Sequence, residues 1–267
     1  MASYQHAEGI CLRRIAFSNT SQVADFLTAE AGRLSVMAKG VTRAPRRGVR
    51  TGFDLLGRYE LLYTRRRGSL QNLTSQWLLE GFVGLRRELP RMLAAYYAAE
   101  LMLSFTVEDE ACPGLYALLV DCLRSFAAGR DVALNVLRLE LGALREHGSC
   151  PTFDSCAACE GMLPARGAVT FSLSDGGPLC RRCERELPGR PGLRTTTARA
   201  DLLRLLAAFS SGAEGPAPAE GQVKAMSALL RFHIRDLLGR ELRMWPYLQQ
   251  RGLSRSLERA RRGAGVA

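Results

Sequence analysis

Several sequence features that mark enzymes are missing from this chain of 267 residues. It has no glycine-rich loop ending in Gly-Lys-Ser/Thr, no Gly-x-Ser-x-Gly elbow and no His-Glu-x-x-His helix. Only three histidines occur, and none stands beside a paired carboxylate or a nucleophilic cysteine at a recognisable spacing. We therefore predict a non-catalytic protein.

The chain also lacks a long apolar run. The longest stretch, residues 92–105, contains Glu100 and is shorter than the about 20 residues that a membrane-spanning helix needs. The first residues, Met1 to His6, have neither the basic nor the apolar region of a secretory signal peptide. We expect a cytoplasmic protein, in which the eight cysteines stay reduced unless a metal binds them.

Lysine is scarce, with two residues among 37 cations, yet the chain carries a net charge of +11 and a pI near 9.7. Such a charge predicts attraction to polyanions, namely nucleic acid, an anionic membrane surface or acidic peptides. The charge gathers at the two ends of the chain. The net charge is +6 over residues 1–80, −2 over 81–150, +1 over 151–195 and +6 over 196–267.

The first 80 residues have the pattern of a small β domain. Apolar and polar residues alternate over residues 34–39 and 53–63, which is the period of a half-buried strand. Residues 10–15 and 70–79 are further predicted strands, and residues 21–31 are predicted to form a short helix that ends at a glycine. Several short strands with one brief helix predict a small closed or partly open barrel, with an OB-fold as the leading candidate.

Two basic loops distinguish this β domain. Residues 39–50 join two predicted strands with five cations, and residues 65–68 form an arginine-rich turn. Phe53, Tyr59 and Tyr63 fall on the apolar face, so we assign them to core packing and not to base stacking. Binding should therefore depend on backbone phosphates, with little sequence preference and a strong salt dependence. The candidate nucleic-acid contacts are Arg13, Arg14, Lys39, Arg43, Arg46, Arg47, Arg50, Arg65, Arg66 and Arg67.

The rest of the chain is mainly helical in pattern. Helices are predicted over 85–105, 113–128, 131–147, 197–209 and 223–238, where apolar residues recur every three or four positions. The tail, residues 251–262, repeats arginine every four residues. This tail is either a second phosphate contact or a solvated chain end.

Four cysteines interrupt the helical region at the spacing of a metal site. Cys156 and Cys159 form one CxxC pair, and Cys180 and Cys183 form a second pair twenty residues later. Two such pairs predict a tetrahedral Cys₄ zinc site, and residues 169–173 suit a short ribbon hairpin between them. Vestigial or redox-active cysteines are the alternative.

A closed Cys₄ site leaves no coordination position for a substrate, so we expect one structural Zn²⁺ ion. Of the other cysteines, Cys11, Cys112 and Cys122 are expected to be buried free thiols. Cys150 lies near the first pair and is the one candidate for a substitute ligand.

These patterns together predict an α+β protein. An OB-fold-like barrel comes first, and an all-helical domain with an inserted Cys₄ zinc ribbon follows. The expected domains are a nucleic-acid-binding barrel over 1–80, the first part of the helical domain over 81–150, the ribbon over 151–195, and the remaining helices with the basic tail over 196–267.

Local motifs along nearly the whole chain resemble the bacterial RecO family of recombination mediators. Ile10-Cys11-Leu12-Arg13 resembles that family's first strand. Residues 26–40 resemble its helix, glycine turn and strand ending in Ala-Lys-Gly. Arg138-Leu139-Glu140-Leu141 with Gly148 resembles the helix that leads into its zinc ribbon.

The resemblance implies a DNA repair protein of the RecF pathway. Such proteins bind single- and double-stranded DNA and anneal complementary strands without ATP. With RecR as partner, they help to load RecA on DNA coated by single-strand-binding protein (SSB). By the same resemblance, Lys39 corresponds to the lysine of the Ala-Lys-Gly strand end. Arg138 corresponds to an arginine near a dock for the SSB tail; the alternative role of Arg138 is a helix-surface ion pair.

Two other classes of function stay open on the sequence alone. One is a zinc-ribbon module that binds RNA or the ribosome, and the other is a non-catalytic protein adaptor whose charge serves solubility. No membrane partner and no small-molecule substrate are expected.

Overall fold

The computed structural model describes residues 4–39, 52–65, 68, 70–186, 194–212 and 216–249. The chain divides into two compact units. The first unit joins Met1–Asn135 to Leu242–Ala267, and the second is Val136–Glu241. The first unit is therefore built from both ends of the sequence.

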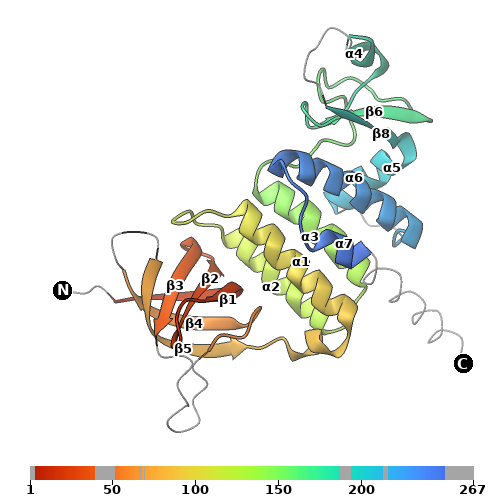
Figure 1. Cartoon of the computed structure of the whole chain (residues 1–267). Coiled ribbons are helices and arrows are strands. Elements are labelled where there is room, and N and C mark those ends of the chain that lie inside the picture. Colours follow the sequence, from red (N-terminus) through yellow and green to blue (C-terminus); the bar gives the residue numbers. More distant parts are fainter. Residues whose placement is uncertain are drawn as a thin grey trace, which may run out of the picture. The chain divides into compact units, whose positions relative to one another are not determined.

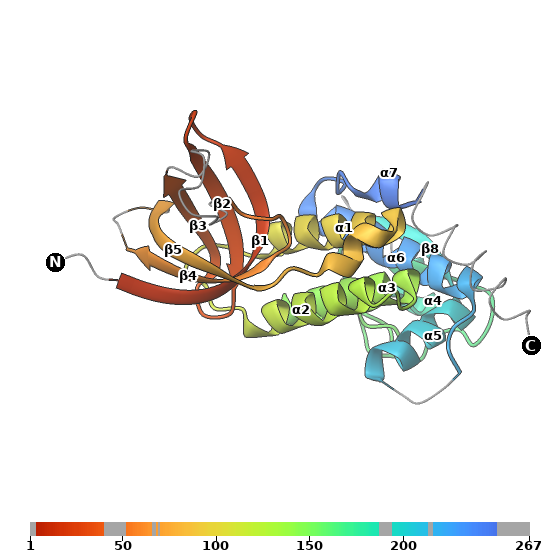
Figure 2. The same cartoon turned by 90° about the horizontal axis from the view of Figure 1, so that it is seen from below.

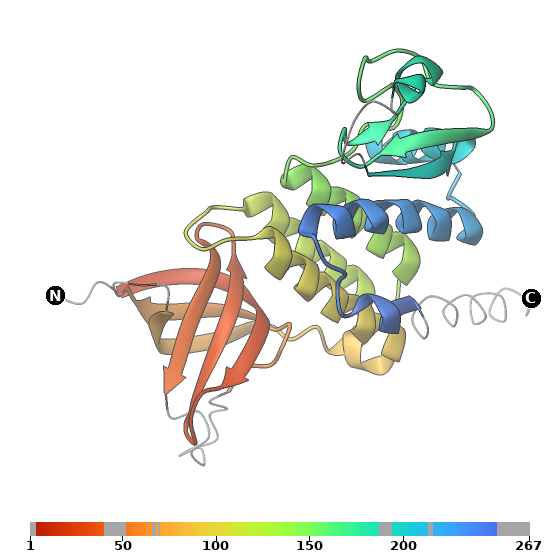
Figure 3. The same ribbon diagram turned by 45° about the horizontal axis from the view of Figure 1, so that its top comes forward.

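Five strands of the first unit form a closed barrel (Figures 1 and 3). They are β1 (Tyr4–Ala16), β2 (Ser21–Thr28), β3 (Gly32–Lys39), β4 (Arg58–Thr64) and β5 (Leu70–Glu80). The order around the barrel is β1-β2-β3-β5-β4, and every pair is antiparallel except β3 with β5. Closure leaves no strand edge free to pair with another chain. The predicted OB-fold-like barrel is confirmed.

Aromatic rings fill the inside of the barrel. Phe26, Phe53 and Tyr59 meet edge to face, with ring centroids 4.9 to 6.0 Å apart. Tyr63 is also buried, in the same apolar cluster. Edge-to-face packing of buried rings stabilises a core beyond the burial of their area. The assignment of Phe53, Tyr59 and Tyr63 to core packing is thus confirmed.

The prediction of a short helix over residues 21–31 is wrong, because residues 21–28 of this segment form strand β2. Hydrogen-bonded ladders join it to β1 on one side and to β3 on the other. Asp25 obscured the strand pattern: it is charged yet buried, since Arg13 and Ser35 bond its carboxylate at 2.6 and 2.7 Å. The glycine taken as the helix stop, Gly32, follows the turn over 29–31 and is the first residue of β3, with φ of +60°.

Helices complete the first unit. They are η1 (Val83–Arg87), α1 (Leu89–Phe105), α2 (Pro113–Ala127) and the short α7 (Trp245–Tyr247). Glu100 of α1 accepts backbone hydrogen bonds from Arg243 and Met244, both at 2.8 Å. Trp245 then packs edge to face on buried Tyr97, with centroids 6.1 Å apart. The segment from residue 242 is thereby fixed against α1.

The second unit combines helices (Figure 2) with a small three-stranded sheet (Figure 1). Its elements are β6 (Ala168–Ser172), β7 (Gly177–Pro178), α4 (Arg181–Arg185), β8 (Thr195–Arg199), α5 (Ala200–Ser211) and α6 (Glu220–Leu238). Helix α3 (Val132–Glu146) begins in the first unit and continues into the second. Within the described parts of the chain, we find no helix that meets the length and apolarity needed to cross a membrane.

The predicted helix over 197–209 starts too early. Residues Thr195–Arg199 form strand β8, which pairs along β6 in the order β7-β6-β8. Three consecutive threonines favour a strand, since a β-branched side chain loses rotamer freedom in a helix. The helix itself, α5, begins at Ala200.

Candidate metal centre and basic surfaces

The structure brings the four cysteines of the two CxxC pairs together. The sulfurs of Cys156, Cys159, Cys180 and Cys183 all lie within 4.8 Å of one another. The Sγ atoms of Cys159 and Cys180 are 3.7 Å apart, far beyond the about 2.05 Å of a disulfide bond. All four are free thiols.

Backbone turns hold the two pairs in place. The amide of Cys156 donates to Gly161 O at 2.9 Å, and the amide of Glu160 donates to Cys156 O at 2.8 Å. A Cβ atom added at Gly161 would lie 3.2 Å from the Cys159 sulfur, so the turn passes close to the thiols. The second pair opens helix α4, where the Glu184 amide donates to Cys180 O at 2.9 Å.

The thiols influence one another's ionisation. Burial opposes ionisation of Cys156, but backbone hydrogen bonds from Cys180, Ala158 and Cys159 outweigh it and lower its pKa to about 7. Side-chain hydrogen bonds to Cys159, followed by burial, raise the pKa of Cys183 to about 12. Backbone hydrogen bonds, the largest from Cys183, lower the pKa of Cys180 as well. Negative charge is therefore favoured on Cys156 and Cys180 and opposed on Cys183, as expected where thiols converge on a site for a cation.

This arrangement fits a tetrahedral metal. Zinc–sulfur bonds of about 2.3 Å place the sulfurs of a regular tetrahedron about 3.8 Å apart. The 3.7 Å separation of Cys159 and Cys180 already matches that spacing. Among the described residues, the metal-ligating cluster contains these four cysteines and not Cys150.

The other cysteines have different surroundings. Cys11 and Cys122 are buried, as predicted, and Cys112 is half-buried. Burial raises the pKa of Cys11 to about 12, so its thiol stays protonated at neutral pH. Cys150 is half-buried, and burial raises its pKa as well.

Three of the predicted contact arginines that the structure describes have local partners. Arg13 bonds Asp25 at 2.6 Å, Arg14 donates to Phe53 O at 2.6 Å, and Arg65 pairs with Asp109 at 3.1 Å. Lys39 is exposed at the end of β3. Because a guanidinium has five N–H donors, each of these arginines keeps donors for a phosphate. Arg43, Arg46, Arg47, Arg50, Arg66, Arg67 and the tail over 251–262 lie outside the described residues.

An apolar row that sequence reasoning missed lies on the outer face of the barrel. Ile15, Val23 and Met37 are cross-strand partners on β1, β2 and β3, and Ile15 lies two residues along β1 from Arg13, on the same face. Ile15 is 49% exposed, and Phe17, just past the end of β1, is 63% exposed. This face therefore combines cations with apolar side chains. The sequence holds one signal for this residue: an aromatic side chain, Phe17, comes shortly after two arginines, Arg13 and Arg14. That pattern could have predicted Phe17 as a base contact.

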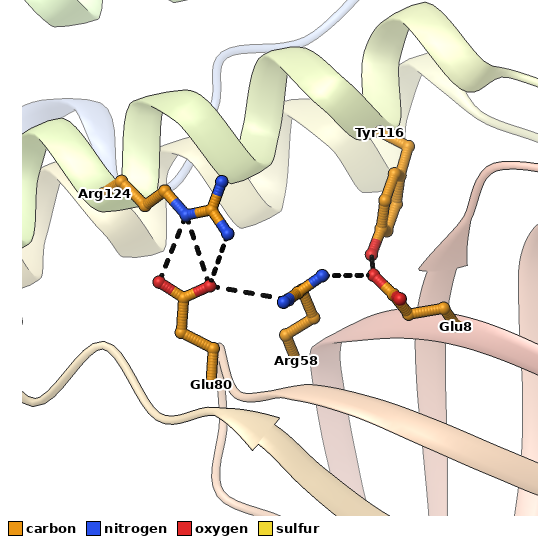
Figure 4. A network of polar contacts seen from close by, with 5 residues as sticks. All are labelled: Glu8, Arg58, Glu80, Tyr116 and Arg124. Atoms are coloured by element: carbon orange, nitrogen blue, oxygen red, sulfur yellow. Dashed lines mark hydrogen bonds and ion pairs between the residues drawn. The ribbon is translucent and has the colours of Figure 1, made fainter.

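A network of charged side chains joins the barrel to α2 within the first unit (Figure 4). Arg124 of α2 contacts both carboxylate oxygens of Glu80, the closest at 2.9 Å. Arg58 of β4 bonds Glu8 at 2.5 Å and lies 3.5 Å from Glu80. Tyr116 of α2 donates to Glu8. Burial opposes ionisation of Glu8, but the bonds from Tyr116 and Arg58 outweigh it and lower its pKa.

Arg138 lies on the exposed side of α3 in the second unit. Its guanidinium carbon is 6.0 Å from the centroid of the Phe209 ring, at the outer limit of a cation–π contact. The nearby Arg145 donates to Ser210 at 2.7 Å. An arginine beside an aromatic ring is chemically suited to an acidic and apolar peptide, and this is the setting of the predicted partner residue.

Comparisons with known proteins match both parts of the chain. A family model described as "Recombination protein O N terminal" matches residues 1–82, and one described as "Recombination protein O C terminal" matches residues 86–246. The DNA repair protein RecO of Anaeromyxobacter sp. strain Fw109-5 is 34% identical over 91% of this chain and 95% of its own length. The proteins of the same name from Myxococcus xanthus and Rhodopirellula baltica are 31% and 29% identical, over 92% and 90% of this chain and 97% of each relative.

Proposed function

The chain belongs to the RecO family of DNA repair proteins, and on that premise we propose that it is a recombination mediator without catalytic chemistry of its own. It would bind single- and double-stranded DNA and anneal complementary strands without ATP. With RecR it would help RecA to replace SSB on single strands. The proposed organisation keeps the nucleic-acid-binding barrel over 1–80, the helical parts over 81–150 and 196–267, and the ribbon over 151–195.

The cationic and apolar outer face of the barrel carries this proposal. Arg13 and Lys39 offer donors to phosphates, while Ile15, and Phe17 just past the end of β1, offer exposed apolar surface to bases. Arg65, which pairs with Asp109, adds a further donor in the same domain. The predicted cations in the two basic loops add to the same domain. Phosphate contacts bind any sequence, which is what annealing of arbitrary complementary strands requires.

One Zn²⁺ held by Cys156, Cys159, Cys180 and Cys183 is the proposed cofactor. The 3.7 Å sulfur separation and the lowered pKa of Cys156 support it. The ion would supply cross-linking of the ribbon and no chemical step, since four thiolates close its coordination sphere.

Two protein partners complete the proposal. Arg138, beside Phe209, is the proposed contact for the acidic, apolar SSB tail. RecR is proposed from family membership alone. Cytoplasmic, nucleoid-associated location follows from DNA as the ligand.

The deciding experiment is an annealing assay on complementary oligonucleotides coated with SSB. The full-length chain should accelerate duplex formation without ATP, and an R138E variant should lose the acceleration on coated strands while keeping it on bare strands. Preference for structured RNA over these strands would favour the RNA-binding alternative. No effect on either nucleic acid would favour the adaptor and overturn the proposal.

A further inference from the structure

A cationic cavity in the second unit is separate from the barrel and from the cysteine cluster. It has a volume of about 500 Å³ and lies where β6 begins, β8 ends and α5 starts. Its lining residues are Arg166, Gly167, Ala168, Arg199, Asp201 and Arg204. Three arginines thus face one carboxylate.

The backbone at this corner is fixed by two contacts. Ala168 pairs with Arg199 across the strands β6 and β8. The amide of Ala200, the first residue of α5, donates to Gly167 O at 3.0 Å. These bonds hold the start of β6 against the start of α5, so the cavity is part of the folded sheet–helix corner.

The arginines of the cavity are not equivalent. Arg199 is held by Asp201 through two bonds, at 2.9 Å from Nε and 2.7 Å from Nη2. Arg166 and Arg204 form no hydrogen bond and no ion pair with any of the residues that the structure describes, and both are exposed. Asp201 therefore neutralises one arginine and fixes its orientation, while the other two keep their charge and all five N–H donors.

A row of hydroxyl groups leads to the cavity along β8. Thr195 and Thr197 are exposed and share one face of the strand with Arg199, because alternate residues point to the same side. Successive donors are about 6.6 Å apart, from a rise of about 3.3 Å per residue. The acidic neighbour of this row is Glu184, which accepts a hydrogen bond from Thr170, the partner of Thr197 on β6.

These features select the class of ligand. Guanidinium forks and threonine hydroxyls are common contacts of nucleic-acid phosphates. The six lining residues include no large apolar side chain, so an acidic peptide would find charge here but no pocket for an apolar anchor. An extended sugar–phosphate backbone, with repeating anions, fits both the arginines and the row of hydroxyls.

We propose that Arg166, Arg204 and Arg199, with Thr197 and Thr195, form a second binding site for the phosphate backbone of single-stranded nucleic acid. The proposal rests on the nucleic-acid binding proposed for the barrel. It adds a second binding site on the same chain, independent of the barrel. With two binding sites, the protein could bind two strands, or two segments of one strand, at the same time.

The test measures the salt dependence of binding to a fluorescent oligothymidylate by the full-length, zinc-loaded chain. In R166A/R204A, two phosphate contacts are lost, so the log–log slope should become shallower by about 1.4. Between 50 and 200 mM salt, affinity should then fall about sevenfold less than in the unaltered protein. Arg199 is left in place because Asp201 already neutralises its charge.

The matched control is R235A/R240A, which removes the same charge from exposed positions of the second unit outside the cavity. Its slope should not change. An equal decrease in this control would indicate a diffuse cationic surface and would overturn the proposal, as would an unchanged slope in R166A/R204A. If the alanine variant unfolds at a lower temperature, R166Q/R204Q, which keeps longer side chains, replaces it in the same measurement.

Three further outcomes separate the possible failures. If R166A/R204A loses affinity for an acidic peptide but keeps its oligonucleotide slope, the cavity is a peptide site and the proposal is wrong. If the unaltered chain does not bind the oligonucleotide at low salt, the proposed function fails and this site fails with it. If the barrel variant R65A/R66A/R67A changes the slope and the cavity variant does not, the second site alone fails.

Discussion

Tyr116 of α2 donates its phenolic hydrogen to Glu8 of β1, across 108 residues of sequence. Burial and this bond to Glu8 raise the pKa of Tyr116, so the phenol stays protonated and keeps donating. The same carboxylate accepts from Arg58, which neighbours Glu80 and through it Arg124. The barrel and α2 are therefore linked by a continuous set of charge-assisted bonds.

Replacing Tyr116 by phenylalanine tests this link. Y116F removes one bond to a charged acceptor and leaves Glu8 with Arg58 as partner, so the free energy of unfolding should fall by about 1.5 to 3 kcal/mol. Urea denaturation measures it. The control is Y96F on α1, since the described part of the chain gives the Tyr96 hydroxyl no hydrogen-bond partner. If Y116F and Y96F lower the free energy of unfolding equally, the bond to Glu8 does not contribute to stability and the prediction is wrong.

His233 makes the second unit sensitive to acid. Its ring is buried, Nε2 bonds Ser149 O at 3.0 Å, and Nδ1 has no described partner. Burial lowers the pKa of His233 below 6.5, against the opposing effects of the Ser149 carbonyl and Asp236. Below pH 6.5 the unfolded chain gains a proton that the folded chain does not bind. This stabilising contribution is complete above pH 6.5 and is lost as pH falls toward the folded pKa.

The measurement for His233 is the free energy of unfolding at pH 7.5 and pH 5.5. The difference between the two should be smaller in H233Q, which cannot titrate, than in the unaltered protein. The variant H147Q, which changes an exposed histidine, is the control and should keep the full difference. If NMR shows that His233 of the folded protein titrates at or above pH 6.5, burial does not lower its pKa and the prediction is wrong.

The cysteine cluster gives a prediction of metal dependence. The chain should bind one Zn²⁺, and C156S or a strong chelator should unfold the ribbon, because the metal contributes on the order of 10 kcal/mol to folding in small zinc modules. Metal analysis and circular dichroism measure the two effects. C150S is the matched control, since Cys150 is outside the cluster, and it should keep the ion. If C150S loses the ion, Cys150 is a ligand and the assignment of the four clustered cysteines as the complete ligand set is wrong.

The basic turn after β4 is the most direct test of the barrel. R65A/R66A/R67A should weaken binding equally for all sequences, and the log–log salt slope for single strands should become shallower by about 2 if all three contact phosphate. D109N, which removes the partner of Arg65, should strengthen binding. A slope that stays unchanged would exclude this turn from the interface.

Regular patterns in the sequence predicted most of the fold. The alternation over 34–39 gave β3, and the three- and four-residue spacing gave α2 and α3 to within about two residues. Strand β2 was missed because tertiary partners compensate a charge that normally marks a surface. Strand β8 was missed because its pairing with β6, a distant segment of the sequence, decides between strand and helix.

The candidate sites divide in the same way. The Cys₄ cluster was predictable, since its ligands stand at characteristic spacings within two short turns. The cavity of Arg166, Arg199 and Arg204 was not, because folding alone brings β6, β8 and α5 to one corner. The bond between Glu8 and Tyr116 could not be predicted, because the two residues are 108 positions apart and no local pattern marks either of them. The exposure of Phe17 could not be predicted either, because it depends on where β1 ends.

The return of residue 242 to α1 affects how the chain is made. The ring that packs on Tyr97 belongs to Trp245, so a ribosome must translate the whole second unit before the first can close. Until then the face of α1 that carries Tyr97 lacks its Trp245 contact and is open to chaperones and proteases. A message truncated before codon 242 would yield a polypeptide with that face permanently uncovered, and it should be degraded more rapidly than the complete product.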